Sequence, residues 1–153
     1  MGRRPHFDFK PTMKDYKIVE NIIKELNLEH IAMREITSIS GGELQKVIIA
    51  MVLAKNPNIL LLDEPISNLD LKNQIEILNL IRNIVKNKEL CGVLVVHDIN
   101  MAIRFGDRFL FLKDGKIFGI YKKNQITPDI ISEVYDIKVD IVKVNDKLLV
   151  IPQ

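Results

Sequence analysis

Two short apolar runs, each ended abruptly by ionisable residues, constrain the fold of this chain most. The first is Ile59–Leu62, which Asp63-Glu64-Pro65 ends, and the second is Gly92–Val96, which His97-Asp98 ends. Continuous runs of this length are typical of strands that are buried on both faces of a parallel sheet. Between them, Leu71–Lys86 carries apolar residues at helical spacing. This alternation predicts an α/β fold with a partly parallel sheet.

Further helices are expected on either side of these strands. The spacing of apolar residues predicts helices over Asp15–Leu28, from Ser40 to about Lys55 and over Ile99–Phe105. Because Val47–Ala54 is apolar on all sides, we expect the second of these helices to be largely buried. Thr127-Pro128 predicts a last helix, with threonine as its cap and proline at its first position.

Two hairpins are expected near the C-terminus. Asp114-Gly115 separates two apolar segments at 109–112 and 116–120, and this dipeptide is a strong hairpin signal. Asn145-Asp146 separates 139–144 from 147–151 in the same way. The sequence therefore predicts antiparallel strands after the parallel pair.

Composition excludes several classes of protein. The 153 residues include 22 Lys and Arg against 20 Asp and Glu, so the net charge of +2 argues against a strongly basic nucleic-acid arm. The single cysteine, Cys91, excludes a disulfide framework. The longest unbroken apolar run is Val47–Ala54, and spanning a bilayer takes about 20 residues.

Asp63 and Glu64 are the first candidate site residues. Both carboxylates follow the carboxyl end of an apolar strand, where open α/β sheets bind their ligands. Adjacent strand residues point to opposite sides, so one carboxylate could hold a hydrated metal ion while the other takes a proton from water. The alternative is a solvated turn with a capping aspartate.

Ser40-Gly41-Gly42-Glu43 allows two compatible interpretations. Ser-x-x-Glu before an apolar helix is a capping box, which predicts a helix that starts at Gly41 or close to it. The same geometry lets a phosphate approach the backbone N–H groups at a helix N-terminus. His97 is a third candidate, because an imidazole at the end of a neighbouring strand could donate a hydrogen bond to that phosphate, although a lone histidine is often only structural.

Along the chain, the glycine turn comes first, the strand that ends in Asp63-Glu64-Pro65 second and the strand that ends in His97-Asp98 third. In this order the three features resemble the ATP-binding subunit of an ABC transporter. Ser40–Glu43, after Ile39, is similar to the family signature, and Ile59–Asp63 resembles Walker B. The resemblance implies a partial P-loop NTPase fold. We expect residues 1–56 to form the helical signature subdomain, residues 57–125 the C-terminal part of the ATPase core, and residues 126–153 a C-terminal helix and hairpin.

The resemblance also implies a role for each matching residue. Ser40, Gly41, Gly42 and Glu43 would face the γ-phosphate of an ATP held by a second ATPase subunit in a head-to-tail dimer. Asp63 would hold Mg²⁺ through water, Glu64 would be the general base or would position the attacking water, and His97 would contact the γ-phosphate. Ser67-Asn68-Leu69-Asp70 resembles the D-loop, and its Asp70 would cross the dimer interface. The implied setting is cytoplasmic, on the inner face of the membrane beside permease subunits.

The chain departs from the family pattern in three places. Ile39 replaces leucine, and Glu43 replaces glutamine, which places a carboxylate near the γ-phosphate unless it turns back into the capping box. No Gly-x-x-x-x-Gly-Lys-Ser/Thr loop occurs in the sequence. Gly2–His6 resembles a stretch of importer ATPases for iron–siderophore, haem and vitamin B12, and Arg3, Arg4 and His6 are either permease-docking residues or solvated charge.

These departures predict a truncated, split or late-started gene product. We expect the P-loop strand to be absent from the middle of the sheet, which leaves strand edges that favour self-association. The isolated chain is expected not to hydrolyse ATP at a meaningful rate. Two alternatives stay open, a non-catalytic association fragment and an SMC-type DNA-maintenance ATPase. The near-neutral charge and the lack of a heptad run argue against SMC, and we expect no nucleic-acid partner.

Overall fold

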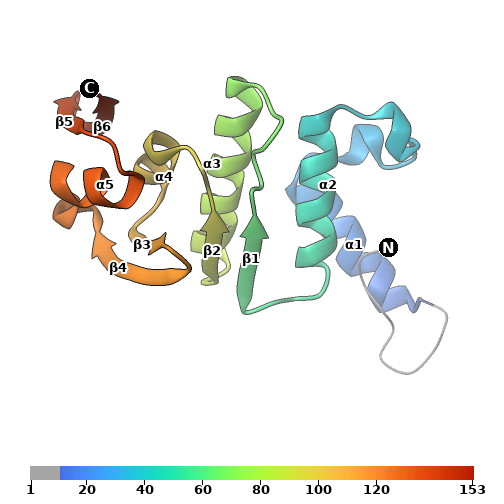
Figure 1. Cartoon of the computed structure of the whole chain (residues 1–153). Coiled ribbons are helices and arrows are strands. Elements are labelled where there is room, and N and C mark those ends of the chain that lie inside the picture. The colour runs from blue at the N-terminus through green and yellow to red at the C-terminus, as the bar shows by residue number, and fades with distance from the viewer. Residues whose placement is uncertain (1–10) are drawn as a thin grey trace. The chain divides into compact units, whose positions relative to one another are not determined.

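A computed structural model describes residues 11–153 of the chain, which divides into two compact units after Val95. The predictions for Arg3, Arg4 and His6 fall outside the described residues. Figure 1 shows the order of the elements along each unit. The subdomain boundaries that we expected at residues 56 and 125 stay predictions.

The first unit begins with a small helical group. Helix α1 spans Met13–Glu25, and its N-terminus is closed by a capping box between Thr12 and Asp15, with the Thr12 N–H donating to Asp15 Oδ2 at 2.9 Å. Two short 3-10 turns follow, at Glu29–Ile31 and Ile36–Ser38. Helix α2, Gly41–Leu53, starts at the residue that the capping-box pattern predicts. This start is therefore confirmed.

The expectation that α2 is largely buried is wrong. Only Ile49, Leu53 and Ala54 are buried in the predicted apolar segment, while Ile48 and Met51 are exposed by more than two fifths. Helix α2 packs against α1 and α3, and these neighbours leave part of its surface open. The apolar residues on that side therefore remain in contact with solvent.

The two predicted strands form a parallel pair. Strand β1 spans Ile59–Asp63 and β2 spans Cys91–Val95, and they pair in register from one end to the other. Their expected arrangement as parallel neighbours is confirmed. Helix α3, Leu71–Asn87, connects them as a crossover and packs against the pair (Figure 1). Its buried residues and those of β1 are part of the core of this unit: Leu60, Leu62, Ile77, Leu78, Ile81 and Ile84.

Burial of these strands on both faces, as their continuous apolar runs predicted, is wrong. Strand β1 alternates, because Leu60 is fully buried and Leu61 is 70% exposed. On β2, the side facing α3 carries Gly92, whose position for a Cβ is 2.8 Å from Val85 of that helix. Val93, on the other side, is 51% exposed. The crossover helix covers one face of the sheet, and the apolar residues of the second face lie open.

The second unit contains two hairpins and two short helices. Its elements in chain order are α4 (Ile99–Phe105), β3 (Arg108–Lys113), β4 (Lys116–Lys122), the 3-10 turn Lys123–Gln125, α5 (Pro128–Tyr135), β5 (Val139–Val144) and β6 (Lys147–Pro152). Both hairpins are antiparallel and confirm the turns predicted at Asp114-Gly115 and Asn145-Asp146. All four turn residues have positive φ, as such tight turns require.

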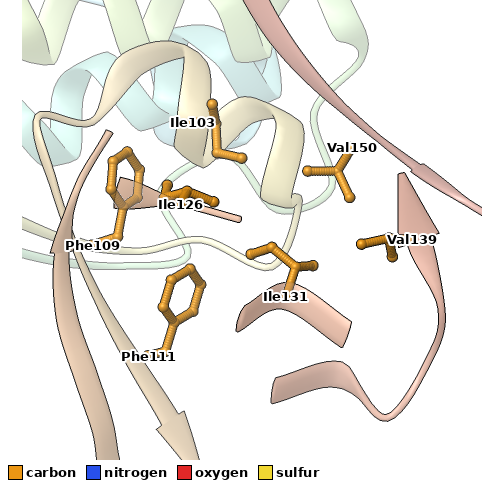
Figure 2. Close-up of a cluster of buried hydrophobic side chains, with 7 residues drawn as sticks. All are labelled: Ile103, Phe109, Phe111, Ile126, Ile131, Val139 and Val150. Atoms are coloured by element: carbon orange, nitrogen blue, oxygen red, sulfur yellow. The ribbon is translucent and has the colours of Figure 1, made fainter. Parts of the chain in front are cut away.

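A compact apolar cluster holds this second unit together. It joins residues of α4, β3, α5 and the last hairpin (Figure 2): Ile103, Phe109, Phe111, Ile126, Ile131, Val139 and Val150. Asn100 adds a polar connection, because its side chain donates to the Val150 carbonyl at 3.1 Å and accepts from the Val150 N–H at 2.8 Å. Helix α4 is therefore fixed to the last strand. Among residues 11–153, each strand pairs with one other strand, in three two-stranded sheets.

Because α3 covers only one face of β1, substitution of two neighbouring leucines should change the free energy of unfolding by very different amounts. Leu60→Ala should lower the free energy of unfolding by about 2–5 kcal/mol, because it leaves a cavity under α3. Leu61→Ala should change it by less than about 0.5 kcal/mol, because that side chain is largely exposed. Urea titrations followed by far-UV circular dichroism would measure both. Equal losses at the two positions would contradict the one-sided arrangement.

Candidate functional site

The turn before α2 is a complete capping box. Ser40 has extended backbone angles, and its hydroxyl oxygen accepts from the Glu43 N–H at 3.3 Å. Glu43 Oε2 in turn accepts from the Ser40 N–H at 2.8 Å and from the Ser40 hydroxyl at 2.7 Å. The Glu43 carboxylate therefore turns back on Ser40.

His30 is a further partner of this turn that the sequence did not reveal. Its Nε2 lies 3.1 Å from Glu43 Oε1, so both carboxylate oxygens of Glu43 have partners. The hydrogen bonds from Ser40, and then that from His30, lower the pKa of Glu43 to about 2. His30 lies in the 3-10 turn Glu29–Ile31, and no periodicity links it to Glu43 thirteen residues later. Only the chain path between α1 and α2 brings the two together.

The two glycines of this turn lie against the start of α3. A Cβ on Gly42 would be 2.6 Å from Asn73 Oδ1, so the side chain of Asn73 occupies the space of any larger residue. A Cβ on Gly41 would touch Leu69 at 3.4 Å. The turn at Ser40–Glu43 and the loop at Ser67–Asp70 are thus in direct contact, although the sequence separates them by more than twenty residues. A larger residue at Gly42 would have to displace the Asn73 side chain.

Asp70 anchors the loop by capping α3. Its Oδ1 accepts from the Asn73 N–H at 2.8 Å, and its Oδ2 accepts from the Asn73 side-chain amide at 2.8 Å. The Asn73 N–H is the main cause that lowers the pKa of Asp70. Gln74 adds a side-chain hydrogen bond to the Leu69 carbonyl at 3.0 Å. Asn73 and Gln74 support the site although sequence reasoning did not select them.

Asp63 and Glu64 lie at the carboxyl edge of the parallel pair. Asp63 is the last residue of β1 and sits opposite Val95, while the Glu64 N–H donates to the Val95 carbonyl at 3.1 Å. Glu64 has a positive φ of 44°, which is a costly conformation for a residue other than glycine. Its carbonyl accepts from both the N–H and the hydroxyl of Ser67, which hold the turn. Both acidic residues are exposed at this edge.

His97 follows β2 by two residues and belongs to the second unit. The residue after it, Asp98, caps α4 by accepting from the N–H groups of Asn100 and Met101 at 2.8 and 3.0 Å. His97 is exposed at the start of this unit. Its approach to Glu64 stays a prediction, while Asp63 and Glu64 lie together as expected.

The acidic side chains at the end of β1 suit a cation that keeps most of its water ligands rather than one that is enclosed by protein ligands. Within residues 11–153, no group of three or more His, Cys, Asp or Glu side chains could hold a metal ion. Mg²⁺ usually keeps several waters and binds through a carboxylate or two together with substrate phosphates. Asp63 at the strand end fits that mode, in which a phosphate ligand supplies most of the remaining contacts.

Comparison with known proteins gives a consistent family assignment. The family model described as "ABC transporter" matches residues 4–67. An ABC transporter ATP-binding protein of Methanocaldococcus jannaschii is 43% identical over 99% of this chain and 60% of its own length. A petrobactin import ATP-binding protein of Bacillus anthracis is 34% identical over 99% of the chain and 57% of its own. A cobalamin import ATP-binding protein of Halobacterium salinarum is 34% identical over 91% of the chain and 35% of its own.

Solved structures resemble the chain in the same way. An inward-facing ABC transporter of metal-chelate type superimposes with a TM-score of 0.86 at 27% identity, over 97% of this chain and 61% of that one. A dimeric ATP-binding cassette with bound ADP and Pi gives a TM-score of 0.62 at 34% identity, over 76% of this chain and 51% of the other. The chain therefore spans 60% or less of the length of the three relatives named above. No helix in residues 11–153 is long and apolar enough to cross a membrane.

Loss of the cap should measurably destabilise α2. Ser40→Ala removes the acceptor for the Glu43 N–H and should lower the free energy of unfolding by about 1 kcal/mol. Ser38→Ala is a matched control. Ser38 lies two residues before the cap, and its hydroxyl donates only to the Glu35 carbonyl. Urea unfolding of both variants would test this. A loss at Ser38 as large as that at Ser40 would contradict the capping role.

The lowered pKa of Glu43 predicts a pH dependence of stability. Because the folded pKa is about 2 and the ordinary value is 4.5, ionised Glu43 stabilises the fold above pH 4.5. That stabilisation should be lost as the pH falls from about 4.5 to 2. Glu43→Gln should lose less stability than the wild type across this window, as thermal unfolding at each pH would show. A carboxyl resonance of Glu43 that titrates near 4.5 in NMR would contradict it.

Proposed function

Because the chain belongs to the ABC transporter ATP-binding family, of which it spans a part, we propose that it supplies two sides of an importer's ATP site. One side is the signature turn, Ser40–Glu43, which faces an ATP held by a second ATPase subunit. The other is the hydrolytic edge with Asp63, Glu64 and His97. The observation that carries the proposal is the contact between Gly41 of the signature turn and Leu69 of the proposed D-loop segment, Ser67–Asp70.

The signature turn is suited to bind the γ-phosphate of ATP. The N-terminus of α2 carries the positive end of the helix dipole, and the small side chains at Gly41 and Gly42 allow a phosphate to reach the backbone. The extra negative charge at Glu43 is held by Ser40 and His30. This arrangement supports a working signature despite the replacement of glutamine by glutamate.

The hydrolytic edge divides the remaining chemistry between three side chains. Asp63 holds Mg²⁺ through water, and the ion, when bound, neutralises charge on the phosphates. Glu64 accepts the proton of the attacking water as that water bonds to the γ-phosphorus and ADP leaves. His97 donates a hydrogen bond to the γ-phosphate. Phosphoryl transfer depends mostly on such positioning and on electrostatic stabilisation.

The D-loop supports a dimeric arrangement for this site. Asp70 caps α3 and ends a loop that lies beside the signature turn. A movement of this loop would therefore affect both the start of α3 and the signature turn. In the proposal, the loop crosses to the second ATPase subunit of a head-to-tail pair. A dimeric cassette with ADP and Pi is among the similar structures, which supports this mode of association.

The transported cargo is a metal chelate or cobalamin, and the ATPase works beside permease subunits on the inner face of the membrane. Support comes from relatives named for petrobactin and cobalamin import and from the metal-chelate type structure. A non-catalytic association fragment is the second candidate, favoured by the absence of a P-loop motif from this sequence. The SMC-type alternative has no such support, and no nucleic-acid partner is proposed.

ATP hydrolysis by the complemented site tests the proposal. The chain alone should show no activity, and adding the part of the Methanocaldococcus jannaschii relative that lies outside the matched region should produce it. Glu64→Gln should then reduce the rate by about a hundredfold or more, because the general base is lost. Glu133→Gln, the same change at an exposed residue of α5 to which the proposal assigns no role, should leave the rate unchanged.

Two results would contradict this proposal. If the unmodified chain hydrolyses ATP alone and Glu64→Gln abolishes that activity, the chain already carries a complete site. If the complemented site is fully active with Glu64→Gln, Glu64 is not the base. A complex that forms but never hydrolyses ATP would favour the association fragment.

A further inference from the structure

His30 reaches the signature turn from a different part of the chain. It lies in the 3-10 turn Glu29–Ile31, and its Nε2 is 3.1 Å from Oε1 of Glu43 on α2. Leu28 and Ile31 on either side of it are both buried, so they fix the 3-10 turn in the helical group. The imidazole is therefore held beside Glu43 by packed apolar neighbours, although its own side chain is 60% exposed.

The charge of Glu43 determines which of the two groups donates. Hydrogen bonds from Ser40, and then that from His30, lower the pKa of Glu43 to about 2, so its carboxylate is ionised at neutral pH and only accepts. His30 must therefore donate from Nε2, either as the neutral ring protonated there or as the imidazolium. Its proton goes to Oε1, whereas both hydrogen bonds from Ser40 go to Oε2.

The Ser40 hydroxyl is already engaged in the cap. Its single proton is donated to Glu43 Oε2 at 2.7 Å, while its oxygen accepts from the Glu43 N–H at 3.3 Å. A hydroxyl that donates to Glu43 cannot donate to a phosphate oxygen at the same time. When the signature turn binds ATP, Glu43 and the γ-phosphate therefore compete for this proton.

We propose that His30 is a positioning residue for ATP binding because it lets the Ser40 hydroxyl turn from Glu43 to the phosphate, an inference that rests on the proposed function. After that turn, Glu43 still has two donors, the Ser40 N–H on Oε2 and His30 Nε2 on Oε1. Without His30 the ionised carboxylate keeps only the Ser40 N–H and repels the phosphate more strongly. A neutral glutamine at this position would not need the histidine.

ATP titrations test the proposal. They use the full chain together with the part of the Methanocaldococcus jannaschii relative outside the matched region, which we call the complemented chain. His30→Ala should raise the KM for ATP by about threefold to fivefold, the upper range for a partly exposed ion pair, and should leave kcat unchanged. In the Glu43→Gln background, His30→Ala should leave the KM unchanged, because no charge is then left to hold.

Two further variants separate this role from a general loss of charge or fold. Lys24→Ala removes a cation that pairs with Glu20 at 2.7 Å on α1 and is 59% exposed, so it is matched to His30 and should leave the KM unchanged. His30→Gln keeps a side-chain N–H donor and should recover part of the affinity for ATP. Thermal unfolding of each variant checks that the fold is kept.

A spectroscopic measurement on the full chain alone tests the contact without ATP. The carboxyl resonance of Glu43 should titrate at a higher pH in His30→Ala than in the unmodified chain, because one donor to the carboxylate is lost. It should still titrate below 4.5, because both hydrogen bonds from Ser40 remain.

Three outcomes would overturn the inference while the proposed function stands. They are an active complemented chain whose KM does not respond to His30→Ala, an equal rise in KM with and without Glu43→Gln, and a Glu43 titration that His30→Ala leaves unchanged. Absence of ATP hydrolysis by the unmodified complemented chain is a different result, since it overturns the proposed function and the inference with it.

Discussion

One-sided coverage of a parallel strand pair is the constraint on which the first unit depends. Helix α3 connects β1 to β2 and buries Leu60 and Leu62, and this packing sets the register that pairs Asp63 with Val95. The same register brings the Val95 carbonyl to the Glu64 N–H, which supports the strained turn after β1. The buried core, the acidic edge and the exposed apolar face of the strand pair are therefore three results of one packing arrangement.

The N-terminus of α3 also supports the turn that begins α2. Asp70 fixes Asn73 through two hydrogen bonds, and Asn73 in turn fills the space beside Gly42. Because the caps of α2 and α3 touch, a displacement of Ser67–Asp70 would also move the turn at Ser40–Glu43. The Glu43 carboxylate is held on the cap by Ser40 and His30, so its charge stabilises the helix start. Glu43, which looks unfavourable in the sequence because it adds a negative charge, therefore stabilises the start of α2.

Local sequence patterns predicted much of the fold because they depend on neighbouring residues. The start of α2 at Gly41, the hairpin turns at Asp114-Gly115 and Asn145-Asp146, and the Thr127 cap of α5 all follow from short-range chemistry. Burial was less well predicted. The all-apolar segments of α2 and β1 suggested complete burial, but Met51 and Leu61 are exposed, because burial depends on which elements pack around a segment. The same type of apolar side chain is therefore buried or exposed according to that packing.

The sequence by itself determined the elements, their order and the ionisable residues at the strand ends, since periodicity, caps and turns are properties of adjacent residues. The tertiary structure alone decided which distant residues meet. It placed Asn73 on Gly42 and His30 on Glu43, and it left Leu61 and Val93 uncovered on one side of the sheet. The physical reason is that these contacts arise from the packing of α2 and α3 and from the crossover between the strands. No pattern among neighbouring residues predicts that packing.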